Sequence, residues 1–386
     1  MDKSKTLKKS YVGIILLGIV SLLGDVVYEG ARGIIPGYLK FLGATALIVG
    51  LIGGLGDFLG YSLRLLSGFL ADAMHTYWFF IFLGYGLIIS IPFLGLSTSL
   101  EIAIILVLLE RIGKALRSPA RDTVLSVISK GVGAGKAFGI HELLDQVGAI
   151  IGPLIVTVAM LFTNNNYGYT FTILFIPFLT LLAALTYTYK KTKSTIIQKS
   201  EKGVKGKLEK PFYIYTFAVL LNTLGLIPYT LILYKASQIL PLENQWIIPL
   251  IYLLIQGVDA AFALFAGYAY DKFGVKTLLA PFMLSIIPPI ITLGSTELST
   301  LIIASIFFGL ILGTQESIYR AAVSKFAPIQ LRGTAYGIFN TAYGIGFLIS
   351  GSIYGILMDL HVPLFLTSIY TLITQFTAII LLLKIK

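Results

Sequence analysis

The sequence predicts an all-α membrane protein with twelve transmembrane helices in two pseudo-symmetric six-helix bundles. Of its 386 residues, 56% are hydrophobic and 12% are charged, and the mean hydropathy is +0.89. A soluble domain carries about 25% charged residues, so this composition excludes a soluble enzyme. The chain has no cysteine and three histidines, which excludes a disulfide framework and a cysteine-ligated metal site. We therefore expect no metal and no cofactor.

Twelve apolar stretches meet the length of about 20 residues that a bilayer-crossing helix needs. The basic start of the chain leads into the first stretch without a small-residue cleavage site, so we interpret that stretch as a transmembrane helix. We expect kinks at Pro36, Pro153, Pro177, Pro228 and Pro288–Pro289. The predicted spans are 11–38, 44–71, 77–97, 100–128, 136–162, 168–189, 211–238, 246–270, 276–294, 298–323, 332–358 and 363–383.

The positions of Lys and Arg predict the orientation of the chain. Twenty of the 29 basic residues fall in the termini, in segment 190–210 and in the connections on the same side, against Lys40 and Lys235 on the other. Cytoplasmic segments carry an excess of Lys and Arg. We therefore expect a multi-pass protein of the cell membrane with both termini in the cytoplasm. Much of the net charge of +11 is then an orientation signal and an attraction to anionic lipid, so we expect no nucleic-acid partner.

An internal repeat divides the chain into two halves. Segment 190–210 is the only long hydrophilic stretch, and six predicted spans lie on each side of it. We predict an N-terminal bundle at 1–189, a cytoplasmic linker at 190–210 and a C-terminal bundle at 211–386. Duplicated six-helix halves are typical of transporters that bind substrate near the middle of the membrane. With offsets of 198 or 199, the matched positions are Gly68 and Gly267, Asp72 and Asp271, Arg121 and Arg320, Gly139 and Gly337, and Gly148 and Gly346.

The connection after the eighth span carries a family motif. The segment from Gly267 to Lys276, with Asp271, Lys272 and Gly274, resembles the loop signature G-x-x-x-D-[RK]-x-G-x-[RK] of the major facilitator superfamily of transporters. The first-half copy lacks the basic residue and the glycine, because Ala73-Met-His-Thr follows Asp72. The resemblance implies the major facilitator fold, in which the third, sixth, ninth and twelfth helices are peripheral. In agreement, the interiors of those four predicted spans contain no charged residue.

The fifth span carries a second motif. Gly139, Gly148, Gly152 and Pro153 resemble the signature G-x8-G-x3-G-P-x2-G-G of drug/proton antiporters, although Val156–Thr157 replaces the last glycine pair. The resemblance implies solute export in exchange for protons. From the residues themselves, we expect these glycines to permit close packing of helices, since small residues are the usual means of close approach in membranes.

Charged residues inside the spans concentrate in the first, second, fourth and fifth spans. Each costs about 2.5–3.5 kcal/mol on insertion scales, so such residues face the bundle interior or a wet cavity. In the first span, three of them are spaced i, i+4 and i+7 and therefore share one helix face. The chemistry is expected in the N-terminal bundle. The candidates for proton or substrate binding are Asp25, Glu29, Arg32, Asp57, Glu110 and Arg111.

Two further groups of residues complete the predicted site. One group, nearer the cytoplasm, is expected to form ion pairs or loop contacts that gate the protein, with His141 as a partner of Asp145. The other supplies an aromatic and polar cavity wall, mostly from the C-terminal bundle. The gating candidates are Arg64, Asp72, Arg117, Arg121, Glu142, Asp145 and Asp271. The wall candidates are Tyr28, Asn222, Tyr229, Tyr252, Gln256, Gln315, Tyr319, Asn340 and Tyr343.

Together these features predict a proton-coupled secondary transporter of a small organic solute, working by alternating access as a monomer and exporting the solute. A buried carboxylate loses solvation, which favours its neutral form, while a nearby Arg opposes this. An importer or exchanger of an organic anion is the alternative, because Arg32, Arg111 and Lys114 would attract anions. A non-transporting receptor stays open as a different class. No nucleophile elbow, zincin motif or P-loop is present in the sequence, so we expect no enzyme activity.

Overall fold

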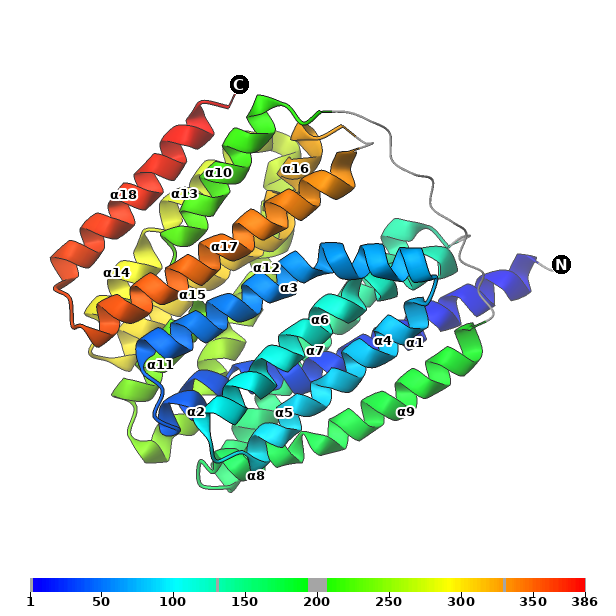
Figure 1. Ribbon diagram of the computed structural model, residues 1–386, viewed down its shortest axis with the longest axis horizontal. Helices are drawn as coiled ribbons and strands as arrows, with labels where there is room; N and C mark the ends of the chain where they lie inside the picture. The colour runs from blue at the N-terminus through cyan, green and yellow to red at the C-terminus, as the bar shows by residue number, and fades with distance from the viewer. Residues whose placement is uncertain (1–2, 130–131, 194–206, 329–330, 386) are drawn as a thin grey trace. The chain divides into compact units, whose positions relative to one another are not determined.

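The computed structural model describes residues 3–129, 132–193, 207–328 and 331–385, and every regular element in these ranges is a helix (Figure 1). The chain divides into two compact units: unit 1 is Met1–Arg32 with Leu63–Glu201, and unit 2 is Gly33–Ser62 with Lys202–Lys386. The division falls inside helix α3, after Ser62. The proposed bundles 1–189 and 211–386 therefore stay a prediction about the parts that move, and most of the predicted linker lies outside the described residues.

Unit 1 contains a long first helix packed lengthwise against two others. α1 lies along α7 and α9, and α4 packs against α6. Ser99 caps α6 by accepting the backbone N–H of Ile102, and Asn166 caps α8 in the same way. The helices of unit 1 are α1 (Lys3–Arg32), the second part of α3 (Ala46–Met74), α4 (Tyr77–Gly86), η1 (Leu87–Ile89), α5 (Ser90–Phe93), η2 (Leu94–Leu96), α6 (Leu100–Ile128), α7 (Ala134–Phe162), α8 (Tyr167–Ile173) and α9 (Phe175–Thr192).

Unit 2 is built around α10, which packs against α17 and α18, and around α12, which packs against α15 (Figure 1). The first part of α3 lies so close to α17 that a Cβ on Gly50 would come 2.1 Å from the carbonyl oxygen of Gly351. The helices are α2 (Ile35–Phe41), α10 (Lys210–Leu224), α11 (Tyr229–Ile239), η3 (Leu242–Ile247), α12 (Ile248–Phe273), η4 (Gly274–Leu278), α13 (Leu279–Leu284), α14 (Ile287–Gly294), α15 (Leu298–Thr314), the π-helix η5 (Gln315–Tyr319), α16 (Arg320–Phe326), α17 (Arg332–Asp359) and α18 (Leu364–Leu383).

Ten segments of the described chain are long and apolar enough to cross a membrane. One of them, Leu242–Gly294, has 53 residues and joins two of the predicted spans. Helix α6, predicted as the fourth span, is not among the ten because its middle carries several charged residues. The all-helical membrane fold is thus confirmed, and the count of twelve helices stays a prediction.

Most of the predicted kinks coincide with breaks between helices, because proline cannot donate the backbone hydrogen bond that continues a helix. Pro36 lies in the first turn of α2, Pro228 is the residue before α11, and Pro288–Pro289 opens α14. Pro153 lies inside the continuous helix α7 instead, and Pro119 does the same in α6. The break between α1 and α2 falls at residues 33–34, and the break between α10 and α11 falls at residues 225–228.

Candidate functional site

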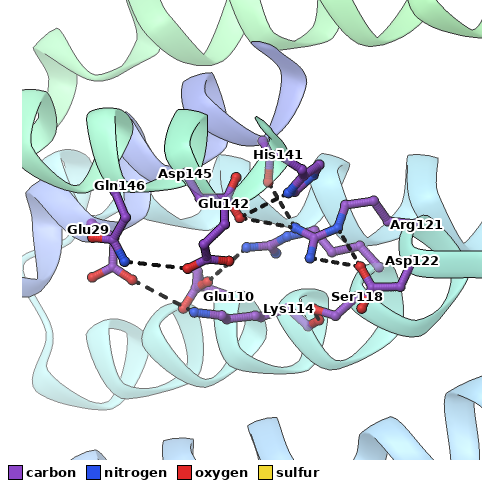
Figure 2. A network of polar contacts seen from close by, with 12 residues as sticks. Glu29, Glu110, Lys114, Ser118, Arg121, Asp122, His141, Glu142, Asp145 and Gln146 are labelled. Carbon is purple, nitrogen blue, oxygen red and sulfur yellow. Dashed lines mark hydrogen bonds and ion pairs between the residues drawn. The ribbon is translucent and has the colours of Figure 1, made fainter. Parts of the chain in front are cut away.

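The intramembrane charges of unit 1 form one polar network on α1, α6 and α7 (Figure 2). The three charged residues of α1 share one face, as their spacing predicts. Because α1 packs along α7 and also contacts α6, charged faces that are far apart in the sequence meet inside unit 1. Figure 2 shows Glu29, Lys114 and Glu110 toward one end of the network and Asp145, His141 and Arg121 toward the other.

Glu29 is the acceptor for two cations from different helices. Arg32, one turn further along α1, places Nη1 2.5 Å from Glu29 Oε1. Lys114 of α6 places Nζ 3.7 Å from the same oxygen. Glu29 is buried, so these cations supply the compensation that a carboxylate needs away from water. The pair with Lys114 links α1 to α6 by a charge contact.

Glu110 lies between two arginines of its own helix. Arg111 Nε is 3.7 Å from Oε2, and Arg117 Nη2 is 3.6 Å from Oε1. Arg117 also donates a hydrogen bond to the carbonyl oxygen of Gly84 on α4, at 3.3 Å. Both Glu110 and Arg117 are almost fully buried. The structure therefore places Arg117 with Glu110 rather than with the carboxylates of α7.

Three of these cations lie close to the aromatic ring of Tyr28. The Arg32 and Arg117 guanidinium carbons lie 4.9 and 5.0 Å from the ring centroid, and Lys114 Nζ lies 4.6 Å from it. The face of an aromatic ring attracts cations, and this attraction is stronger away from water. Arg117 also lies 5.1 Å from the ring of Tyr85 on α4. Sequence reasoning missed Tyr85 because its span carries no charge and so gave no signal.

Asp25 differs from the other buried carboxylates of the network. It is 8% exposed and, in the part of the chain that the structure describes, it takes part in no ion pair. Glu29, Asp145 and Lys114 are its electrostatic neighbours. Two negative charges and one positive charge act on it, which disfavours a third permanent negative charge there.

Arg121 contacts side chains of three helices at the other end of the network. It donates to Ser21 Oγ of α1 at 2.8 Å and to Asp122 Oδ1 at 2.9 Å, and its Nη1 lies 3.6 Å from Asp145 Oδ2. His141 Nδ1 lies 3.4 Å from the same Asp145 oxygen, one turn away on α7. The side chain of Arg121 thus connects α1, α6 and α7. Ser21 was not anticipated, since an isolated serine in an apolar helix carries no distinctive pattern.

Among the described residues, three of the other predicted charges, Glu142, Asp72 and Asp271, form no ion pair with this network. Glu142 is exposed and accepts a hydrogen bond from Gln146 at 3.4 Å. Asp72 accepts one from Tyr77 at 2.8 Å, and Asp271 is exposed at the end of α12. Arg64 lies in the part of α3 that belongs to unit 1, and Asp57 lies in the part that belongs to unit 2.

Two wall candidates of unit 2, Asn222 and Tyr319, are tied into its interior. Asn222 donates to Gln375 Oε1 at 2.8 Å and accepts from the Tyr319 hydroxyl at 2.9 Å, while Gln375 donates back to the Asn222 carbonyl at 2.9 Å. Asn222 and Gln375 are fully buried. Their partners are satisfied inside unit 2, so the geometry gives Asn222 and Tyr319 a packing role. The sequence did not indicate a role for Gln375, because its helix, α18, was predicted to be peripheral and to face lipid.

A small cavity of about 10 Å³ in unit 2 is next to the π-helix η5. The Tyr343 hydroxyl donates to Gln315 Oε1 at 2.8 Å, whereas Gln315 Nε2 is buried without a hydrogen-bond partner. π-Helical turns are frequent at functional sites. Here the wider turn places Gln315, Glu316 and Arg320 on the cavity. Its lining is completed by Tyr61, Phe339, Asn340 and Tyr343.

The other wall candidates of unit 2 lie elsewhere. The rings of Tyr229 and Tyr252 have centroids 5.2 Å apart and form an aromatic pair, with Tyr252 buried. Gln256, one turn further along α12, is half-buried. Asp259 of the same helix is buried and close to Gly313 of α15. These residues do not line the cavity beside η5.

The motif glycines of α7 divide into two kinds. A Cβ on Gly148 would lie 2.4 Å from the Leu22 carbonyl oxygen and 2.9 Å from Asp25 Cβ, and a Cβ on Gly152 would lie 2.6 Å from the Val26 carbonyl oxygen. Gly139 has nothing within 4 Å of the corresponding point. Gly148 and Gly152 therefore let α7 touch the backbone of α1, and Gly148 holds the segment that carries Asp25.

Within the described residues, no group of three or more His, Cys, Asp or Glu side chains could hold a metal ion. The network is instead built from paired carboxylates and cations in an apolar helical unit. Such an arrangement can exchange protons or bind a charged solute. A family model described as the Major Facilitator Superfamily matches residues 14–351. The chain belongs to the major facilitator superfamily.

Relatives and a solved structure agree with this assignment. A protein of Mycobacterium tuberculosis described as uncharacterised is 34% identical over 358 residues, covering 90% of this chain and 87% of the relative. A Methanocaldococcus jannaschii protein described as an uncharacterised MFS-type transporter is 30% identical over 355 residues, covering 89% and 88%. The nucleoside transporter NupG superposes with a TM-score of 0.73 at 15% identity, covering 97% of this chain and 100% of that one. At that identity the likeness shows the fold alone. The superfamily resemblance is confirmed, and the protein is a multi-pass membrane transporter.

The superfamily loop signature has a visible structural basis. Gly274 ends α12 with φ +63°, in the left-handed region that glycine adopts without steric cost. The equivalent position in the first half, 199 residues earlier, is His75, and it has φ +55°. The backbone turn of the repeat is thus kept where the glycine is lost, at the cost of the strain that a side chain feels in this region.

Proposed function

We propose that this superfamily member is a proton-coupled secondary transporter of a small organic solute that works by alternating access. The observation that carries the proposal is Asp25, a buried carboxylate of unit 1 outside every ion pair of the described chain. An ionised carboxylate that is buried outside any ion pair is costly, so such a group takes up a proton or a cation. Its neighbours Glu29 and Asp145 already have cations within 4 Å.

Lys114 is the group that makes the protonation of Asp25 switchable. Its Nζ reaches Glu29 at 3.7 Å and Tyr28 at 4.6 Å, and its charge also acts on Asp25. A movement of α6 relative to α1 that brings Lys114 nearer to Asp25 would favour the ionised form and release the proton. The reverse movement would favour proton uptake. A solute that competes for Lys114 or Asp25 would then exchange with the proton.

We propose export as the direction, on the basis of the antiporter-like glycines of α7. The alternative, uptake or exchange of an organic anion, has its own support in the convergence of Arg32, Lys114 and Arg117 on one aromatic ring. These cations would attract a carboxylate or phosphate and repel a cationic drug. The charge of the solute therefore distinguishes the two proposals, because the anion alternative requires an anionic solute.

The experiment combines binding and flux. Purified protein is first screened by thermal shift with tetraphenylphosphonium, benzoate and uridine as cationic, anionic and neutral probes. A binding probe is then added to proteoliposomes that contain a pH-sensitive dye. We expect probe-driven proton movement in the wild type, its loss in Asp25→Asn with solute exchange retained, and no loss in the control Glu297→Gln, which changes an exposed carboxylate before α15.

Undiminished proton movement in Asp25→Asn would refute the coupling role of this residue. Binding of a probe without any flux in the wild type would favour a receptor. A preference for benzoate would favour the anion alternative over the export of cationic solutes.

We further propose a cell-membrane protein that works as a monomer, with both termini in the cytoplasm and with 1–189 and 211–386 as the moving bundles. The excess of lysines at the chain ends and in segment 190–210 supports this orientation. The cysteine-free sequence makes the test direct: a single cysteine introduced at Lys9 or Lys384 should resist a membrane-impermeant maleimide in intact cells. Labelling of both positions in intact cells would reverse the orientation.

A further inference from the structure

A groove lies at the end of unit 1 where α1 begins and α9 ends. Its volume is about 300 Å³, which is within the range of small-ligand sites. Both helices contribute to it, so it is a feature of the packed unit and not of one helix end. The groove is lined by Lys8, Lys9, Val12 and Gly13 of α1 and by Lys191 and Thr192 of α9.

The rim of the groove is cationic and lacks acidic partners. Lys8, Lys9 and Lys191 are exposed, and none of them takes part in an ion pair among the described residues. The described part of α1 contains no acidic residue before Asp25, and α9 contains none. Three like charges around one groove repel one another unless an anion joins them. An anion bound in the groove would relieve this repulsion.

The floor of the groove is apolar. Gly13 lets α6 approach, because a Cβ there would lie 2.9 Å from Ile128 Cγ2. The Thr192 hydroxyl donates to the Thr188 carbonyl at 2.6 Å, so it offers the groove no free donor. Val12 is 46% exposed, and the exposed stripe continues along α1 through Ile15 at 44% and Ile19 at 36%. Residues spaced i, i+3 and i+7 share a helix face, so an apolar track leads away from the lysines.

Aromatic side chains mark the level of the groove in the membrane. Lys191 Nζ lies 5.5 Å from the ring of the exposed Tyr187, and the rings of Trp78 and Tyr189 meet at 5.2 Å. Tyr11 of α1 has Lys136 Nζ at 5.3 Å. Tyr and Trp collect at the headgroup level of a bilayer. In a bilayer placed at this level, the lysines would lie beside the phosphates of one leaflet, and the apolar track would lie beside its acyl chains.

We infer that the groove binds an anionic phospholipid, with its phosphodiester between Lys8, Lys9 and Lys191 and an acyl chain along Val12, Ile15 and Ile19. A basic pocket between transmembrane helices is the type of site that takes cardiolipin-like headgroups. A free phosphate would bind the same lysines, but it has no acyl chain that could contact the apolar track. The site is separate from the charged network of α1, α6 and α7, and it does not depend on proton coupling.

The test uses the full-length protein, delipidated in a neutral detergent. Cardiolipin, phosphatidylcholine or inorganic phosphate is added, bound lipid is counted by native mass spectrometry, and the unfolding midpoint is measured. The triple variant Lys8→Gln, Lys9→Gln, Lys191→Gln is compared with the control triple Lys272→Gln, Lys276→Gln, Lys325→Gln. The control removes the same charge from exposed positions of unit 2.

We expect cardiolipin to bind and to raise the unfolding midpoint of the wild type and of the control triple. In the groove variant its affinity should fall about a hundredfold, since each lysine near an anionic surface contributes roughly a fivefold factor. Equal cardiolipin binding by the groove variant would overturn the proposal, as would equal binding of phosphatidylcholine. A stabilisation by inorganic phosphate as large as that by cardiolipin would overturn it in favour of a simple anion site.

Discussion

Two glycines of α7 have opposite expected responses to the same substitution. Gly139 and Gly148 belong to one motif and lie in one helix, nine positions apart in the sequence. Gly148 touches the backbone of α1, and Gly139 touches nothing within 4 Å of its missing Cβ. Replacing each by alanine adds one methyl group and leaves the charge of the protein unchanged. The pair therefore separates helix contact from the helical preference of alanine.

The structure sets the size of the expected effects. The new methyl of Gly148→Ala would lie 2.4 Å from the Leu22 carbonyl oxygen, whereas ordinary contact begins at 3.4 Å. α1 and α7 must therefore separate locally by about 1 Å, and overpacking of this kind costs about 1–3 kcal/mol. Gly139→Ala meets no obstacle and should gain about 0.5–1 kcal/mol, since glycine is unfavourable inside a helix.

Thermal unfolding of the purified proteins, followed by tryptophan fluorescence, measures both effects. Gly148→Ala should unfold at a lower temperature than the wild type, and Gly139→Ala at the same or a higher temperature. Because the methyl of Gly148→Ala also meets Asp25 Cβ at 2.9 Å, solute-driven proton movement should fall further than the loss of folded protein explains. If Gly139→Ala is as harmful as Gly148→Ala, the assignment of helix contact to Gly148 is wrong.

Three further outcomes concern unit 2. Asp359 accepts the first two backbone N–H groups of α3 at 2.9 Å each, so Asp359→Ala should lower the stability by about 1–2 kcal/mol in denaturant titration; no change would contradict the capping role. Gln375→Leu leaves the buried Asn222 amide without its partner and should cost about 1–3 kcal/mol, while Thr377→Val on the exposed side of α18 should be neutral; equal effects would refute the network. Burial lowers the pKa of Lys40 from its ordinary value of 10.5, so below that value the unfolded chain binds more protons and stability rises with pH. The wild type should therefore gain stability relative to Lys40→Met as the pH rises toward 10.5, and a parallel response of the two proteins would exclude the effect.

The charged faces of the network could be predicted because a charge inside a bilayer is expensive. That cost restricts the residues to buried faces, and helical spacing then shows which of them share a face. Glu29 and Arg32 are close for this reason alone, as neighbours on one turn of α1. The superfamily followed from the repeat and from the loop signature, because both are written as residue types at fixed spacings.

The pairings between helices could not be predicted in this way. Arg117 was grouped with the carboxylates of α7 as a gating candidate, but it lies with Glu110, while Arg121 is the residue that reaches Asp145. Which cation meets which carboxylate depends on the height and rotation of each helix. In unit 1 these are fixed partly by the contact of Gly148 and Gly152 with α1.

The sequence by itself determined that this protein is helical, lies in a membrane and belongs to a duplicated transporter family, because composition, periodicity and repeats are properties of the chain. The tertiary structure decided that Asp25 lies outside the ion pairs of the described residues, that Asn222 is held by a glutamine of α18, and that three lysines meet over an apolar groove. These facts depend on distances between segments far apart in sequence. Packing of side chains sets such distances, and no local pattern records them.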